Sequence, residues 1–226
     1  MADLADDWIT AEWLDTVGRV ADLKSAYKQL ASHPKHESLA VIALREPGSR
    51  RMMFFQTLSL MFGQTAAVYA FLRFSRALSA LASKLLNLVV VEFFDDFTQL
   101  ESPATAQSAQ DALESLFDLL GWELAMSEEK RAPFCEKFTA LGVAVDLRRS
   151  AEGVVELSNK AGRVRAIRSQ VDEAIALGSL GFRDALSLRG KLAFAEGQNY
   201  GRIAAPVARM LSRWARWGVP GRNTCS

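Results

Sequence analysis

The most constraining feature of the sequence is an apolar run, residues 88–94, that leads directly into Asp95 and Asp96. Val and Phe dominate the run, which predicts a buried β-strand, a tight turn and a returning strand over residues 97–100. Two adjacent carboxylates repel each other, and near a core they are costly unless water or a cation neutralises them. The pair therefore indicates either an ordinary Asp-rich turn or a cation site.

A third aspartate, Asp22, lies at the end of a shorter apolar segment, residues 19–23, which is also predicted to be a strand. If that strand lies beside the hairpin of residues 88–100, three carboxylates meet at one end of a sheet. Such a set suits two Mg²⁺ ions, which are hard cations that prefer oxygen ligands. Two ions about 4 Å apart can activate a 3′ hydroxyl and stabilise a leaving pyrophosphate.

The remaining pattern predicts a mixed α+β chain. A hairpin is expected from strands at 38–44 and 51–58, because Pro47 and Gly48 favour a turn between them. Apolar residues recur at helical spacing in longer segments, at residues 66–86, 104–120, 160–176, 182–196 and 202–216. Shorter elements are expected as a turn or short helix at 24–30, a helix at 8–16 and strands at 122–125, 132–134 and 139–147. A shift in composition near residues 150–158 predicts a boundary between subdomains.

The sequence carries no sign of secretion or membrane insertion. Its first residues, MADLADDWIT, are acidic and lack the apolar core of a signal peptide. Polar residues interrupt the longest apolar stretches, which stay below the roughly 18–20 residues of a membrane span. Cys135 and Cys225 form no CxxC pair, so neither a zinc knuckle nor a disulfide framework is indicated. These patterns predict a soluble intracellular protein, cytoplasmic or nuclear, that does not engage a membrane.

Charge is distributed unevenly along the 226 residues, although the net charge is only +1. Residues 158–226 contain twelve Lys and Arg against four Asp and Glu, a net charge of +8, so the preceding part carries −7. A basic C-terminal third can follow a phosphate backbone. A solvated helix face is the alternative interpretation.

Five blocks of the sequence, taken in order, resemble the motifs of reverse transcriptases. ADLKSAYKQL resembles the motif that begins with the first catalytic aspartate, LMFGQTAAVYAFLR resembles LPFGLxxAPxxFxR, and FFDD resembles YxDD. LGWELAMSEEK and FTALGVAV resemble the two blocks that follow. The matches lie at residues 21–30, 60–73, 93–96, 120–130 and 138–145. Residues 158–216 resemble the thumb and connection helices of retrotransposon enzymes more weakly.

The resemblance implies an RNA-directed DNA polymerase that adds dNTP to a primer 3′ hydroxyl on a nucleic-acid template. The implied fold is a polymerase palm, an antiparallel sheet with helices packed on one face (split βαβ), over residues 22–150. A helical thumb or connection follows at 151–226, and residues 1–21 form a lead-in. The implied cofactor is a pair of Mg²⁺ ions, with Mn²⁺ as a substitute.

The resemblance also assigns roles to individual residues. Asp22, Asp95 and Asp96 are the implied catalytic acids and metal ligands, joined by the Leu23 carbonyl. The implied nucleotide-binding residues are Leu23, Tyr27, Phe62, Gly63, Gln64 and Lys130. Tyr27 would select deoxynucleotides, with a core tyrosine as the alternative, and Lys130 would protonate pyrophosphate, with a surface lysine as the alternative. Leu141 and Gly142 match the primer grip, and the implied nucleic-acid contacts are Arg163, Arg165, Arg168, Lys191, Arg202 and Arg209.

The chain departs from the family at several positions. Met61 and Val68 replace two prolines, and Phe93 replaces a tyrosine, but none of these changes removes a metal ligand. The segment before Asp22 is short, and Arg19 is its only basic residue. The fingers are therefore expected to be absent, replaced, or supplied by an upstream segment or separate chain, as in a fragment or truncated gene copy.

Two alternatives to an active polymerase stay open. One is a catalytically degenerate retroelement fragment that keeps the fold and binds nucleic acid without turning over nucleotide. The other is a non-catalytic nucleic-acid-binding module, because split βαβ arrangements also occur in binding domains. Binding modules of that kind place stacking aromatics on the sheet face, whereas the aspartates here are expected at strand tips.

Overall fold

The computed structural model describes residues 15–127, 130–198, 203–217 and 224–225. The chain divides into two compact units, one comprising Met1–Glu136 with Ser150–Glu152 and the other comprising Lys137–Arg149 with Gly153–Ser226. The division near residue 136 lies earlier than the boundary expected near residue 150. The helix predicted at 8–16 lies outside the described residues. The architecture is α+β, with small antiparallel sheets and helices, as the sequence pattern predicted.

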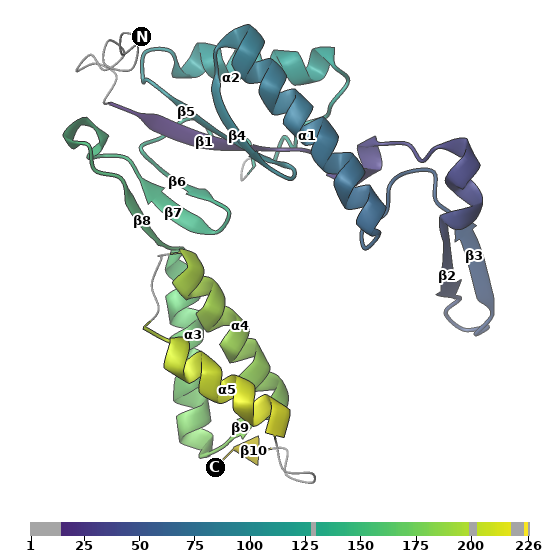
Figure 1. Cartoon of the computed structure of the whole chain (residues 1–226), viewed down its shortest axis with the longest axis vertical. Coiled ribbons are helices and arrows are strands. Elements are labelled where there is room, and N and C mark those ends of the chain that lie inside the picture. Colours follow the sequence, from purple (N-terminus) through teal and green to yellow (C-terminus); the bar gives the residue numbers. More distant parts are fainter. Residues whose placement is uncertain (1–14, 128–129, 199–202, 218–223, 226) are drawn as a thin grey trace, which may run out of the picture. The chain divides into compact units, whose positions relative to one another are not determined.

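The first unit contains a three-stranded antiparallel sheet in the order β1-β5-β4 (Figure 1). Its strands are β1 (Val17–Asp22), β4 (Val89–Phe93) and β5 (Asp96–Glu101), so the two strands predicted around the acidic pair form a hairpin. β1 pairs with β5 along its whole length. The central position of β5 brings Asp22 to the same end of the sheet as the β4–β5 turn.

Strand β4 corrects one expectation, because it is not buried along its length. Val90 is 9% exposed, whereas Val91 is 63% exposed. Successive side chains of a strand point to opposite faces, so covering one face buries only alternate residues. The continuous run of Val and Phe therefore does not indicate burial on both faces here.

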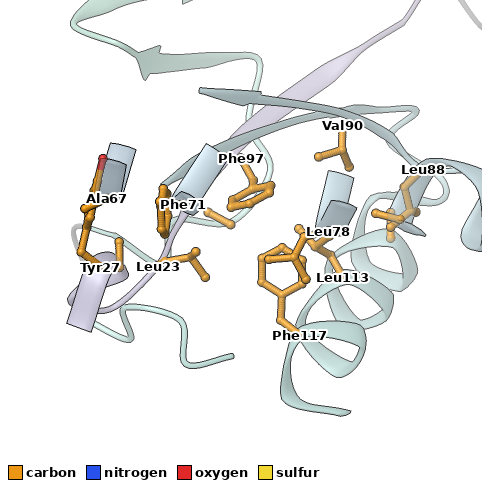
Figure 2. Packing of buried hydrophobic residues seen from close by; sticks show 14 residues of the cluster. Leu23, Tyr27, Ala67, Phe71, Leu78, Leu88, Val90, Phe97, Leu113 and Phe117 are labelled. Carbon is orange, nitrogen blue, oxygen red and sulfur yellow. The ribbon is translucent and has the colours of Figure 1, made fainter. Parts of the chain in front are cut away.

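Helices α1 (Thr65–Leu86) and α2 (Ala106–Leu119) supply the apolar residues that cover the face of the sheet on which Val90 lies. Figure 2 shows Phe97 of β5 gathered with Leu78 of α1 and with Leu113 and Phe117 of α2. The Phe97 and Phe117 rings meet edge to face, with centroids 4.9 Å apart. Full burial of side chains this size contributes roughly 1.5–3 kcal/mol each, which fixes both helices on the sheet.

Smaller elements complete the first unit. The predicted hairpin is present as β2 (Val41–Arg45) and β3 (Met52–Gln56), preceded by the 3₁₀ helices η3 (Ala26–Gln29) and η4 (Pro34–Leu39). The strands expected at 122–125 and 132–134 are absent from the described residues. Leu124 of the first segment instead makes an isolated bridge with Leu23, and Cys135, just after the second segment, makes one with Gly18. Both segments follow the sheet without enough consecutive pairs to form a ladder.

The second unit begins with a three-stranded antiparallel sheet, β6 (Lys137–Ala140), β7 (Val143–Asp146) and β8 (Glu156–Asn159). The predicted single strand at 139–147 is therefore a hairpin, because Leu141 and Gly142 turn the chain between β6 and β7. The 3₁₀ helix η5 (Ser150–Glu152) lies between β7 and β8 but belongs to the first unit.

The predicted C-terminal helices are present as α3 (Ala161–Leu177), α4 (Phe182–Gln198) and α5 (Ala205–Trp217). They pack beside one another (Figure 1), around Ala185, Leu188 and Leu211. The short strands β9 (Leu180–Gly181) and β10 (Thr224–Cys225) pair at one end of the bundle. No helix in the described part of the chain has both the length and the apolar character of a membrane span.

Candidate active site

The acidic site is built by the register between β1 and β5. Asp22 and Asp96 are direct cross-strand partners, and the Leu23 amide donates to the Asp95 carbonyl at 3.1 Å. Directly opposed residues present their side chains on the same face, with Cβ atoms about 4.5–5.5 Å apart. Two carboxylates that are far apart in the sequence thus meet beside Asp95. The pairing of Asp22 with Asp96 places these two acids at the end of the sheet where the sequence led us to expect them.

The turn that carries Asp95 is conformationally unusual. Phe94 and Asp95 connect β4 to β5, and Phe94 has φ +56° although it is not glycine. A bulky residue in the left-handed region costs of order 1–3 kcal/mol and persists only where its surroundings impose it. The buried Ser75 hydroxyl of α1 donates to the Phe94 carbonyl, which ties this turn to the core. Positive φ at this position is also what a two-residue hairpin loop requires.

Electrostatic repulsion among the three carboxylates is visible at Asp96. Burial raises the pKa of Asp96, and the charges of Asp22 and Asp95 raise it further, while Lys130 opposes them. Lys130 donates to Asp22 Oδ2, and this hydrogen bond, together with the charges of the three aspartates, raises the pKa of the ammonium group. The Asp22 side chain is 12% exposed and that of Lys130 is 54% exposed. One ammonium group therefore partly neutralises three acids.

The donors at this site match Mg²⁺ in kind, because carboxylate and carbonyl oxygens are its preferred protein ligands. The Leu23 carbonyl oxygen accepts no hydrogen bond from the residues that the structure describes, so it is available as a ligand. Within that same part of the chain, no three His, Cys, Asp or Glu side chains form a ready-made metal site. The Lys130 ammonium lies against one of the oxygens that a cation would need.

Tyr27 and the residues before α1 lie together. The Tyr27 ring is 5% exposed and stacks on Phe71, with centroids 4.6 Å apart and an angle of 17°. Phe62 contacts the same ring at 4.6 Å and is 73% exposed. Burial raises the pKa of the Tyr27 phenol, and the charge of Asp95 adds to this effect. Tyr27 is thus a core residue whose phenol lies close enough to the acidic site to be influenced by the charge of Asp95.

Gly63 and Gln64 form the entry to α1. Gly63 has φ +92°, which a side chain would strain, and a Cβ there would meet nothing within 4 Å. Gln64 occupies the N-cap position, and its carbonyl accepts the amides of Ala67 and Val68. The positive φ of Gly63 thus shapes the backbone just before the first turn of α1.

Leu141 and Gly142 lie in the second unit, at the β6–β7 turn. Both have positive φ, +50° and +78°, which is typical of the type I′ turns of two-residue hairpins. Arg163 packs beside this turn: it donates to Asn159 Oδ1 at 3.0 Å and stacks on Phe194 at 4.3 Å. A Cβ on Gly142 would lie 2.6 Å from Arg163 Nη2. The residues predicted as primer grip, Leu141 and Gly142, thus lie beside Arg163, one of the predicted phosphate contacts.

The other predicted basic contacts are spread over three helices. Arg165 and Arg168 are exposed on α3, and Arg168 lies 3.8 Å from Asp172. Lys191 on α4 donates to Gln170 Oε1 at 2.8 Å, and Arg209 is exposed on α5. Arg202 lies outside the described residues.

Sequence reasoning missed a buried ionic network behind the acidic site. Arg19 is 2% exposed, and it donates to Gln99 Oε1 at 2.7 Å and to Glu114 Oε1 at 3.0 Å. Arg131 also binds Glu114, with Nη2 to Oε2 at 2.7 Å. Arg19 is therefore a buried structural cation and not a free base of the lead-in. Its place within an apolar strand was the one available signal.

No protein-family model matches this chain, and no curated protein matches it in sequence.

Proposed function

We propose that the first unit is the palm of an RNA-directed DNA polymerase, with Asp22, Asp95 and Asp96 as its catalytic acids. The observation that carries the proposal is the cross-strand pairing of Asp22 with Asp96 beside the strained Phe94–Asp95 turn. An ordinary Asp-rich turn would not require a partner acid on a third strand. The reaction is nucleotidyl transfer from dNTP to a primer 3′ hydroxyl.

The three carboxylates and the Leu23 carbonyl would hold two Mg²⁺ ions. When bound, such ions activate the attacking hydroxyl and neutralise charge on the leaving pyrophosphate. Asp22 and Asp96 supply oxygens from opposite strands, and Asp95 supplies them from the turn. Burial, and then the charges of Asp22 and Asp95, raise the pKa of Asp96, so a bound cation would favour its ionised form.

Lys130 is the proton donor in this proposal. Its ammonium group already lies at Asp22, and the surrounding carboxylates keep it protonated. A protonated amine that leaves Asp22 when cations bind is suitably charged to donate from Nζ to pyrophosphate. The lysine thus has one partner in the free protein and another during turnover.

The proposed sugar-recognition surface is the exposed Phe62 ring with the buried Tyr27 ring beneath it. The ring of Tyr27 is held by stacking on Phe71, and the exposed Phe62 lies against it. An aromatic wall fixed in this way would exclude a 2′ hydroxyl and favour dNTP. Gly63 and Gln64, at the start of α1, would border the nascent base pair.

The second unit is proposed to bind the primer–template as a thumb, with Leu141 and Gly142 as primer grip. Arg163, Arg165, Arg168, Lys191, Arg202 and Arg209 are the proposed phosphate contacts. An upstream segment or a separate chain would supply the fingers, in the cytoplasm or nucleus. A polymerase binding a nucleic-acid duplex needs a cationic surface of this kind.

Template-directed incorporation of labelled dNTP with Mg²⁺ tests the proposal. Asp95→Asn should reduce incorporation about 10²-fold or more, because a carboxylate that would hold the catalytic Mg²⁺ is lost. Asp118→Asn, an exposed change on α2, is the matched control and should retain activity. Equal incorporation by the wild type and Asp95→Asn would refute the assignment. Primer–template binding without any incorporation by the wild type would favour the degenerate fragment.

A further inference from the structure

Two consecutive residues, Lys130 and Arg131, bind two different acids. Lys130 donates to Asp22 at the end of β1, while Arg131 donates to Glu114 on α2. The Arg131 contact is two-pronged, with Nη2 at 2.7 Å from Oε2 and Nε at 3.4 Å from Oε1. The Lys130 and Arg131 amides both donate to the Ser127 carbonyl at 2.9 Å. The backbone at Lys130 and Arg131 is thus hydrogen-bonded to Ser127, while the two side chains bind Asp22 and Glu114.

Glu114 is a fixed anchor for Arg131. Its side chain is 15% exposed, and it also accepts from Arg19 at 3.0 Å and from Gln110 at 2.9 Å. Burial would raise the pKa of Glu114, but its hydrogen bonds with Arg131, Arg19 and Gln110 outweigh this and lower it. The carboxylate therefore stays charged, and the buried Arg19 ties it to β1, the strand that ends in Asp22.

The network and the acidic site share one small cavity. Its lining includes Arg19, Asp22, Glu114, Lys130 and Arg131. Arg19 Nη2 is buried and has no hydrogen-bond partner among the described residues. The two ion pairs, Lys130 with Asp22 and Arg131 with Glu114, are therefore neighbours across a common space.

We propose that Arg131 is a positioning residue, which uses the Glu114–Arg19 anchor to hold Lys130 against the catalytic carboxylate. This inference rests on the proposed function, since it concerns the group assigned as proton donor. A lysine on a flexible stem gains little from an exposed ion pair, because ordering the stem offsets the attraction. An arginine whose planar fork engages a fixed carboxylate orders the adjacent backbone first, and so reduces that cost.

Acetylation of lysines, followed residue by residue by mass spectrometry, tests the proposal without requiring polymerase activity. When the wild-type chain is treated with N-hydroxysuccinimidyl acetate, Lys130 should be acetylated several-fold more slowly than Lys24. The ion pair of Lys24 with Glu123 is exposed. Arg131→Ala should raise the Lys130 rate toward that of Lys24 and leave the Lys24 rate unchanged. Arg131→Lys should restore part of the protection.

Two control variants make the acetylation rates interpretable. Asp22→Asn removes the partner of Lys130 and sets the fully released rate. Glu123→Gln should change Lys24 alone. If Arg131→Ala unfolds the chain, all lysine rates rise together, and Arg131→Lys then carries the test. Wild-type protection of Lys130 in both Arg131 variants would overturn the positioning role, even if stability falls. A normal result with an inactive wild-type enzyme would leave the positioning role standing and refute only the proposed function.

Discussion

Asp22 on β1 and Asp96 on β5 are direct cross-strand partners, although 74 positions separate them in the sequence. Their side chains share one face of the sheet, and Lys130 is hydrogen-bonded to Asp22. Like charges placed opposite each other destabilise a sheet, so this pairing is costly for the fold alone. The proposed binding of cations would offset this cost, and several of its consequences can be measured.

The first prediction concerns the pH dependence of stability. The pKa of Asp96 is raised in the folded chain, mainly by burial and then by Asp22 and Asp95. The contribution of Asp96 to the free energy of unfolding is therefore most favourable below its unfolded pKa of about 3.9. This contribution is lost as the pH rises through the pKa of Asp96 in the folded chain. Asp96→Asn should raise Tm at pH 7, with the gain disappearing near pH 3.5. Thermal melts across this range, without divalent cations, measure the difference. An equal gain at every pH would contradict the electrostatic explanation.

The second prediction concerns divalent cations. Mn²⁺ should raise the Tm of the wild type, because a ligand that binds only the folded state stabilises it, by about 2.7 kcal/mol at a hundred times Kd. Asp22→Asn and Asp95→Asn should abolish most of this effect. Differential scanning fluorimetry with increasing MnCl₂ is the measurement, and Asp118→Asn serves as the control. A wild-type response that survives both substitutions would place the cation elsewhere.

The third prediction concerns the buried network. Glu114→Ala should destabilise the first unit by about 3–5 kcal/mol, because it leaves the buried Arg19 guanidinium without its carboxylate. Replacing both residues, as in Arg19→Met with Glu114→Leu, should recover much of the loss, since no uncompensated charge stays buried. Urea denaturation gives the free energies of unfolding. If the double variant is as unstable as Glu114→Ala, the loss of stability comes from lost packing and not from an uncompensated buried charge.

The fourth prediction concerns the β6–β7 turn. Gly142→Ala should destabilise the second unit by about 1–2 kcal/mol for the positive φ alone, and more because its Cβ meets Arg163. Adding Arg163→Ala should relieve the clash but not the backbone strain. A double-mutant cycle of unfolding free energies separates the two effects. Strict additivity would show that Arg163 moves aside freely.

The fifth prediction concerns nucleic-acid binding. Arg165→Ala and Arg209→Ala should each weaken primer–template binding and reduce the salt slope by about 1, because each phosphate contact releases counterions. Lys84→Ala, in the last turn of α1, is a charge-matched control in the other unit. Fluorescence anisotropy across a range of salt concentrations measures the slope. Equal slopes for all variants would argue against the thumb assignment.

Local sequence determined the elements of this chain. The hairpin around Asp95, the helix from residue 65 to 86 and the three C-terminal helices follow from apolar spacing and turn residues, which depend on neighbours along the chain. Local sequence did not predict the β6–β7 turn, and it did not predict that residues 122–125 and 132–134 would fail to form strands. Whether a short apolar stretch pairs depends on how many partners it finds.

The sequence by itself determined which residues end the strands, and so it identified Asp22, Asp95 and Asp96 as candidates that could meet. Only the tertiary structure decided that Asp22 is paired with Asp96, because strand register is a relation between segments far apart in the chain. It also decided that Val91 is exposed and Arg19 buried, against their residue types. Burial depends on which face the helices cover, and a buried arginine depends on partners as distant as Gln99 and Glu114.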